Sequence, residues 1–100
     1  MNFCEHCNIA IESEICQNCN RKTRQINDED VCFFGEYDTY KSDMLIQSLV
    51  AENISYAVKP VYIFAYKAKY GLPDKKQIYL RFCDFDKAKE IYVTMFNEEE

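Results

Sequence analysis

The chain has 100 residues and a formal net charge of −5, and 48% of its residues are apolar, including eight Tyr and seven Phe. This length suits one ordinary domain, or a small domain beside a metal-stabilised module, and the acidic balance argues against nucleic acid and anionic membranes as partners. No apolar run approaches the roughly 20 residues of a membrane span, and the polar start MNFCEHCN lacks the apolar stretch of a secretion signal. We therefore expect a cytoplasmic protein, in which the six cysteines are metal ligands or buried thiols.

The first 20 residues hold two Cys-x-x-Cys pairs separated by eight residues. The four cysteines are Cys4, Cys7, Cys16 and Cys19. Two such loops facing each other form a closed tetrahedral shell of thiolates, which is typical of structural Zn²⁺ rather than catalytic Zn²⁺. The spacer suits a tight hairpin, with a short strand at residues 9–11. The few apolar side chains of this segment cannot offset the entropy of ordering it, so without metal we predict an unfolded arm.

The position after each cysteine pair is expected to turn with a left-handed backbone. Asn8 and Asn20 stand there, and asparagine tolerates a positive φ better than any residue except glycine. Two disulfides, or iron in a rubredoxin-type electron carrier, remain alternatives for the same cysteines. His6 lies between two of the cysteines, and we interpret it as an exposed loop residue rather than a ligand.

Residues 21–30, RKTRQINDED, are predicted to be a linker because Ile26 is their single apolar residue. Arg21, Lys22 and Arg24 follow the last cysteine closely. We expect them to screen the formal −2 charge of a Zn²⁺ ion with four thiolates. The alternative is a small basic patch for an acidic partner, which would make the module a nucleic-acid binder.

The pattern changes at residue 31, where a second domain, residues 31–100, is predicted to begin. VCFFGEY (31–37) indicates a strand, and residues 38–53 a helix capped by Asp38 or Thr39 and ended by Asn53. Residues 54–70 are extended in character, with a break or bend at Pro60, and 71–74 are a turn. QIYLRFC (77–83) alternates as a strand, and Asp84 then caps a last helix. The buried faces of the two helices are predicted to carry Leu45, Ile46, Leu49 and Val50, and Phe85, Ala88, Ile91, Tyr92, Met95 and Phe96.

The two remaining cysteines, Cys32 and Cys83, fall in these predicted strands among apolar neighbours. We interpret both as buried small hydrophobic residues. If the strands are adjacent and antiparallel, the two thiols could be close, which leaves a redox pair as an alternative.

Two resemblances follow from these motifs. Residues 4–20 resemble the short zinc-ribbon modules at the ends of many bacterial proteins, in which the site is structural. FGEYDTYKSDMLIQSLVAENISYAV and IYLRFCDFDKAKEIYVTMF resemble the DUF2007 type, a family of small bacterial proteins assigned to signal transduction. That resemblance implies a ferredoxin-like β-α-β-β-α domain, part of an α+β chain, with a sensing or adaptor role and no catalytic residue.

The strand order implied by that fold leaves the first strand, residues 31–37, at an open edge. It is apolar and has no lysine to prevent pairing, so we expect a second copy, the linker, the module or a partner to cover it, with self-association favoured. A second candidate surface consists of Tyr56, Tyr62, Phe64, Tyr66, Tyr70 and Tyr79, most of which are expected to pack in the core or across strands.

The function expected from these features is that of a non-enzymatic zinc-binding protein. A structural Cys4 ribbon would be attached to a domain that binds a protein or a small ligand. The alternatives are a thiol-redox or other enzyme that uses Cys32 and Cys83, and a nucleic-acid-binding ribbon. The chain has no Gly-rich phosphate loop and a single His, so no catalytic signature competes with the first interpretation.

Overall fold

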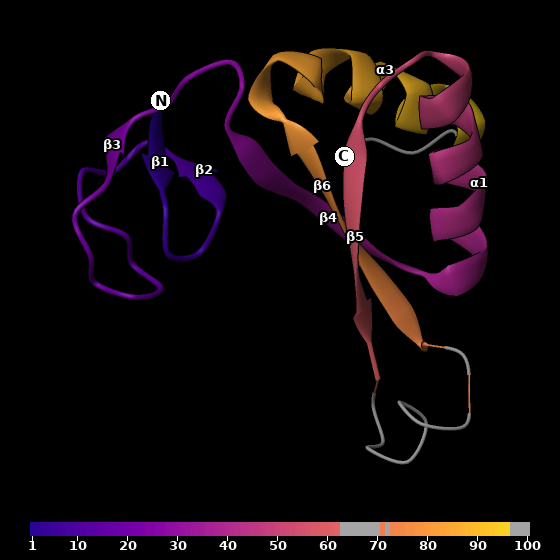
Figure 1. Cartoon of the computed structure of the whole chain (residues 1–100), viewed down its shortest axis with the longest axis horizontal. Helices are drawn as coiled ribbons and strands as arrows, with labels where there is room; N and C mark the ends of the chain where they lie inside the picture. The colour runs from indigo at the N-terminus through magenta and orange to yellow at the C-terminus, as the bar shows by residue number, and fades with distance from the viewer. Residues whose placement is uncertain (63–70, 72, 97–100) are drawn as a thin grey trace.

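The computed structural model describes residues 1–62, 71 and 73–96, and within them the chain is a small α+β protein. The first sheet has the order β2-β1-β3 and is formed by β1 (Asn2–Cys4), β2 (Ile9–Ile11) and β3 (Arg24–Gln25). The second has the order β4-β6-β5, with β4 (Val31–Asp38), β5 (Tyr56–Val61) and β6 (Lys75–Arg81). All pairings in both sheets are antiparallel. The two sheets lie side by side, and the helices lie with the second (Figure 1).

Helix α1 (Thr39–Ala51) begins and ends where the sequence predicts. Asp38 is its N-cap, and the carboxylate accepts a hydrogen bond of 2.8 Å from the Lys41 N–H. Asn53 follows the helix with φ of 59°. The predicted buried face is wrong at Val50, which is 56% exposed. The helix is rotated so that Ser42 is buried instead, and its hydroxyl satisfies the Tyr37 carbonyl at 3.1 Å.

The strand predicted in residues 54–70 is confirmed as β5, but it continues through Pro60 instead of breaking there. Among the described strands, β5 lies at the edge of its sheet and pairs with β6, and an edge strand is where a sheet tolerates the missing N–H of proline. The predicted continuation over residues 63–70, with Phe64, Tyr66 and Tyr70, lies outside the described residues.

The last predicted strand, 77–83, is shifted towards the N-terminus. β6 ends at Arg81, and η1 (Phe82–Asp84), a turn of 3₁₀ helix, leads into α3 (Phe85–Phe96). The predicted burial of Cys83 in a strand is therefore wrong, because Cys83 lies in this turn and is exposed. The predicted face of the last helix is confirmed, with Ala88 and Tyr92 buried and the other four residues packed around them.

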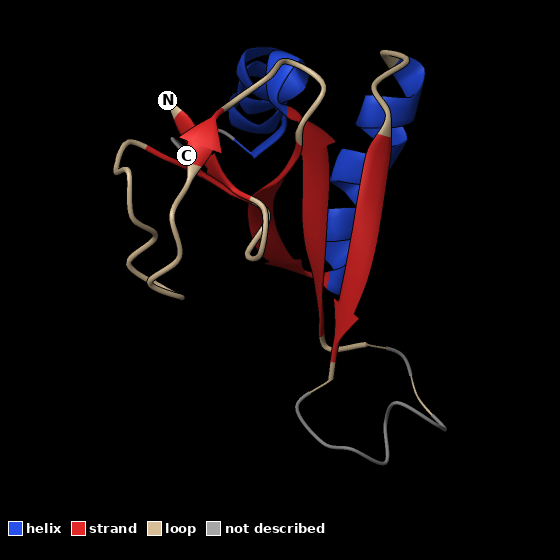
Figure 2. Cartoon of the chain, turned by 60° about the vertical axis from the view of Figure 1, so that its left-hand side comes forward, coloured by secondary structure: helices blue, strands red, loops and turns tan. Residues whose placement is uncertain are grey.

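One apolar core fills the space between the second sheet and the two described helices, which pack on the same face of that sheet (Figure 2). A β-bulge shifts the register of β4 against β6 between Phe33 and Gly35, and Phe34 is the additional residue. The ring of Tyr37 then lies over Gly35, where a Cβ atom would come within 2.3 Å of the Tyr37 hydroxyl oxygen. The core consists of Phe34, Tyr37, Leu45, Leu49, Ile54, Ile78, Leu80, Ala88 and Tyr92.

The residues predicted as a linker, 21–30, take part in the first sheet and form hydrogen bonds with η1. Lys22 bridges to Ile15, and β3 adds a third strand to the first sheet. Farther on, the carbonyls of Asp28 and Asp30 accept hydrogen bonds from the N–H groups of Cys83 and Phe82 at 3.0 and 2.8 Å. We call residues 1–25 the cysteine module, since the first sheet extends to Gln25 rather than ending at residue 20.

β4 is at the edge of its sheet, as expected. The cysteine module supplies part of the predicted cover, because the Phe33 N–H donates a hydrogen bond of 2.7 Å to the Asn8 carbonyl. Self-association stays a prediction. Neither helix of the described part of the chain has the length and apolarity needed to cross a membrane.

Candidate metal centre

The four cysteines of the two Cys-x-x-Cys pairs meet at one point of the cysteine module. The sulfur atoms of Cys4, Cys7, Cys16 and Cys19 all lie within 4.8 Å of one another. Cys4 Sγ is 3.5 Å from Cys19 Sγ, and Cys16 Sγ is 3.9 Å from Cys7 Sγ. Zn–S bonds of about 2.3 Å in a tetrahedron place the sulfurs about 3.8 Å apart, so the cluster has the dimensions of a filled Cys4 shell.

Both predicted left-handed turns are confirmed and shape the site. Asn8 and Asn20 have φ of 55° and 59°. Each closes a turn by donating its backbone N–H to the carbonyl of the first cysteine of its pair, at 2.8 Å for Cys4 and 2.7 Å for Cys16. The two loops are therefore built alike and present their thiols to one site.

The sulfur atoms are only partly shielded from water. Cys4 and Cys16 are buried, whereas Cys7 and Cys19 are half-buried. The side-chain amide of Asn18 donates a hydrogen bond of 3.4 Å to Cys7 Sγ. His6 is exposed and is not among the four clustered ligands, which agrees with its interpretation as a loop residue.

The surroundings separate the pKa values of two of the thiols. Hydrogen bonds from backbone N–H groups, first that of Cys19, lower the pKa of Cys16 to about 7. Removal from water raises the pKa of Cys19 to about 12. Deprotonation of all four thiols would gather negative charge at one point, and a divalent cation at the centre would compensate that charge.

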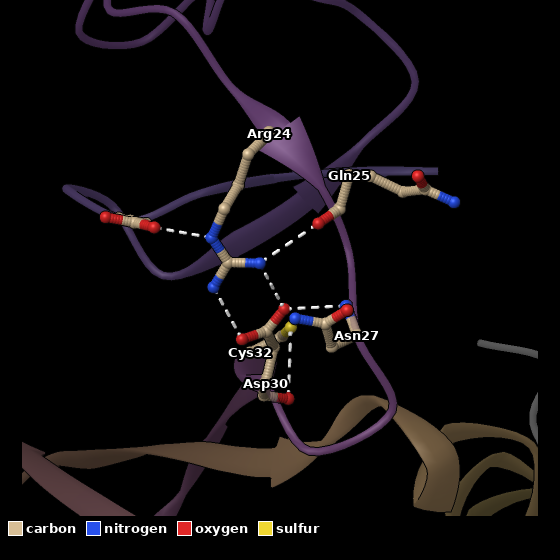
Figure 3. Close-up of polar contacts among 6 residues, drawn as sticks. Arg24, Gln25, Asn27, Asp30 and Cys32 are labelled. Atoms are coloured by element: carbon tan, nitrogen blue, oxygen red, sulfur yellow. Dashed lines mark hydrogen bonds and ion pairs between the residues drawn. The ribbon is translucent and has the colours of Figure 1, made fainter.

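The three basic residues after the cysteines have different surroundings, and their screening of the sulfurs stays a prediction. The Arg24 guanidinium forms two hydrogen bonds with the Asp30 carboxylate, at 2.7 and 2.8 Å, and an ion pair with Glu5 (Figure 3). It also lies over the Phe3 ring, 4.9 Å from its centroid. Arg21 and Lys22 are exposed and line a cavity of about 490 Å³ beside Cys4.

Asp30 is the residue of this region that the sequence did not single out. Its carboxylate also accepts the Asn27 N–H at 2.7 Å, and its carbonyl accepts the Cys32 thiol at 3.6 Å (Figure 3). Opposite charges six residues apart in a polar segment carry no recognisable signal, so the pairing of Arg24 with Asp30 could be found only in the folded chain.

Cys32 and Cys83 have different environments. Cys32 is fully buried, as predicted, and burial raises the pKa of its thiol to about 11. Cys83 is exposed in η1, beyond the end of the strand that pairs with β4. All six cysteines are free thiols in this structure. A buried thiol of high pKa is a poor nucleophile, so the geometry gives no support to a redox pair.

Compared with family models, with curated proteins and with solved structures, the chain gives no match. Fold and site together define a small α+β protein with a four-cysteine cluster that could hold a metal ion.

Proposed function

We propose that this chain is a non-enzymatic zinc-binding protein in which a structural Cys4 ribbon supports a ligand- or protein-binding domain. The observation that carries the proposal is the clustering of four sulfur atoms within 4.8 Å, contributed by two loops of the same construction. Four cysteines complete a tetrahedral shell, so no position is left for a substrate or a reactive water molecule.

Zinc is the metal that this donor set favours. Soft thiolates in a tetrahedral arrangement suit Zn²⁺ or iron. An iron site of this kind would belong to an electron carrier and would need a redox partner, whereas a structural zinc site needs none. Structural zinc contributes roughly 10–16 kcal/mol to the folding of small modules. The first sheet needs such a contribution, because its strands have only three, three and two residues.

The second domain is proposed to be ferredoxin-like, with the elements β4-α1-β5-β6-α3. The support is the strand order β4-β6-β5, which places the first strand beside the third, together with two helices on one face of the sheet. This fold serves many functions, so a sensing or adaptor role follows from the resemblance to signal-transducing domains rather than from the fold.

The cysteine module is attached to this domain by more than the connecting chain. Three backbone hydrogen bonds join the Asn8, Asp28 and Asp30 carbonyls to the second sheet and η1. A metal ion in the module would therefore also stabilise the edge of β4. We infer that the ribbon is a support for the sheet, not an independent arm.

Metal analysis of the protein purified under reducing conditions tests the proposal. We expect one zinc ion per chain, and loss of that zinc in Cys16→Ser. The matched control is Cys83→Ser, which removes an exposed thiol outside the cluster and should leave zinc unchanged. Retention of an ordered first sheet by NMR after removal of all metal with a chelator would refute the structural role, and stoichiometric iron would refute zinc.

A further inference from the structure

The face of the second sheet opposite the helices carries apolar side chains at the end nearest the cysteine module. Phe33, Tyr79 and Ala57 are paired directly across β4, β6 and β5. The Phe33 and Tyr79 rings meet edge to face, with centroids 5.7 Å apart. Val31, on the same face, is 44% exposed, so this end of the face presents apolar surface to solvent.

A groove crosses this face from the cysteine module to β5. It has a volume of about 340 Å³, and its lining residues are Asn8, Val31, Ala57, Val58, Lys59 and Tyr79. A smaller hollow of about 100 Å³ shares Val31, Ala57 and Tyr79 with it. We call the two together the outer groove. The volume lies within the range of sites that take small molecules.

The cysteine module forms one wall of the outer groove. Asn8 is held there by two backbone hydrogen bonds, from its N–H to Cys4 and from Phe33 to its carbonyl. Both bonds depend on the turn that also positions the sulfurs of Cys4 and Cys7. The groove is therefore complete only when the cysteine module is folded against the sheet.

The charged side chains around the outer groove indicate the charge of the ligand that it binds. Lys59 is the single charged side chain among the described residues that line the larger cavity. The smaller hollow adds Arg81, which already forms ion pairs with Glu29 and Asp84. The lining thus combines one position for an anion, at Lys59, with an aromatic ring and small apolar side chains. Such a lining is complementary to an aromatic ligand that carries one negative charge.

We propose that the outer groove binds a small aromatic carboxylate. The ring lies on Tyr79 between Val31 and Ala57, and the carboxylate forms an ion pair with the Lys59 ammonium. Asn8 closes the end nearest the module. This proposal rests on the proposed ligand-binding role of the second domain and names the class of ligand.

Titration of the zinc-loaded full chain with indole-3-acetate, followed by amide NMR spectra, tests this site. We expect saturable shifts that centre on Ala57, Lys59 and Tyr79. Lys59→Gln should weaken indole-3-acetate binding about threefold, as expected for a partly exposed ion pair, and should leave binding of the neutral indole-3-acetamide unchanged. Lys89→Gln, an exposed lysine on α3, is the matched control and should change neither ligand.

A second variant tests the contribution of the Asn8 side chain to the outer groove. Asn8→Gly keeps the left-handed turn, because glycine adopts a positive φ without strain, but removes the side chain. It should retain zinc and bind indole-3-acetate more weakly than the parent chain does.

Three results would overturn the site. The first is an absence of saturable shifts below about 10 mM, since such binding is too weak even for a fragment-sized ligand. The second is equal weakening of the binding of both ligands by Lys59→Gln. The third is a set of shifts centred on other residues. Concentration-dependent shifts without ligand that centre on Ala57, Lys59 and Tyr79 would assign this face to a second copy of the chain and would also overturn it. Zinc measured in the same sample separates the two proposals, since zinc bound without ligand binding refutes this one alone.

Discussion

Replacing Asp30 by asparagine tests how firmly the cysteine module is attached to the second sheet. The Asp30 carboxylate is 14% exposed, and it accepts three hydrogen bonds of 2.7–2.8 Å, two from Arg24 and one from the Asn27 N–H. An asparagine side chain keeps one acceptor oxygen but replaces the other by an NH₂ group, which cannot accept from the guanidinium.

The magnitude follows from the number and kind of bonds lost. A hydrogen bond to a charged group contributes about 1.5–3 kcal/mol when buried, and the partial exposure of this pair lowers that contribution. Asp30→Asn should therefore lower the free energy of unfolding by about 1–2 kcal/mol. The increase in hydrogen exchange should be largest at the Phe82 and Cys83 amides, which bond to carbonyls of the same segment.

Urea unfolding of the zinc-loaded chain, followed by circular dichroism, measures the change. Glu29→Gln is the matched control, since the Glu29 carboxylate is 75% exposed in its pair with Arg81 and should contribute little. An Asp30→Asn variant no less stable than Glu29→Gln would refute the assigned role of this carboxylate.

The pH dependence gives an independent check. Hydrogen bonds from Arg24, and then from the Asn27 N–H, lower the pKa of Asp30 below its ordinary value. A carboxylate with a lowered folded-state pKa stabilises fully above the unfolded value, about 3.9, and this stabilisation is lost only as the pH falls through the folded value. The difference between the parent chain and Asp30→Asn should thus be constant from about pH 8 to about pH 6. A difference that shrinks in this interval would show that another group is responsible.

Three further predictions concern backbone and thiols. Asn53→Gly should match or exceed the stability of the parent chain, whereas Asn53→Ala should destabilise by about 1 kcal/mol because φ is 59°; unfolding by urea distinguishes them. Gly35→Ala should destabilise by roughly 1–3 kcal/mol, because its Cβ would meet the Tyr37 ring, and an unchanged midpoint would contradict that packing. In zinc-loaded protein, Cys83 should react at once with a thiol reagent and Cys32 only upon unfolding; a rapidly reacting Cys32 would revive the redox alternative.

Features that depend on a few neighbouring residues were predictable from the sequence. The spacing of the cysteines predicted their clustering, because two short loops with thiols at both ends have few ways to pack. The left-handed turns at Asn8, Asn20 and Asn53 follow from the conformational range of one residue type. The order of strands and helices after residue 30, and the N-cap at Asp38, follow from periodicity and capping chemistry.

Features that depend on partners far along the chain were decided by tertiary structure. The polar segment 21–30 indicates a linker, yet Arg24 and Asp30 satisfy each other there, and β3 completes the first sheet. Strand β6 ends at Arg81 because η1 turns the chain towards the Asp28 and Asp30 carbonyls, which leaves Cys83 exposed. The outer groove joins Asn8 to Lys59 across three strands. Local propensity acts over a few residues, whereas these contacts depend on which surfaces meet once the two sheets pack together.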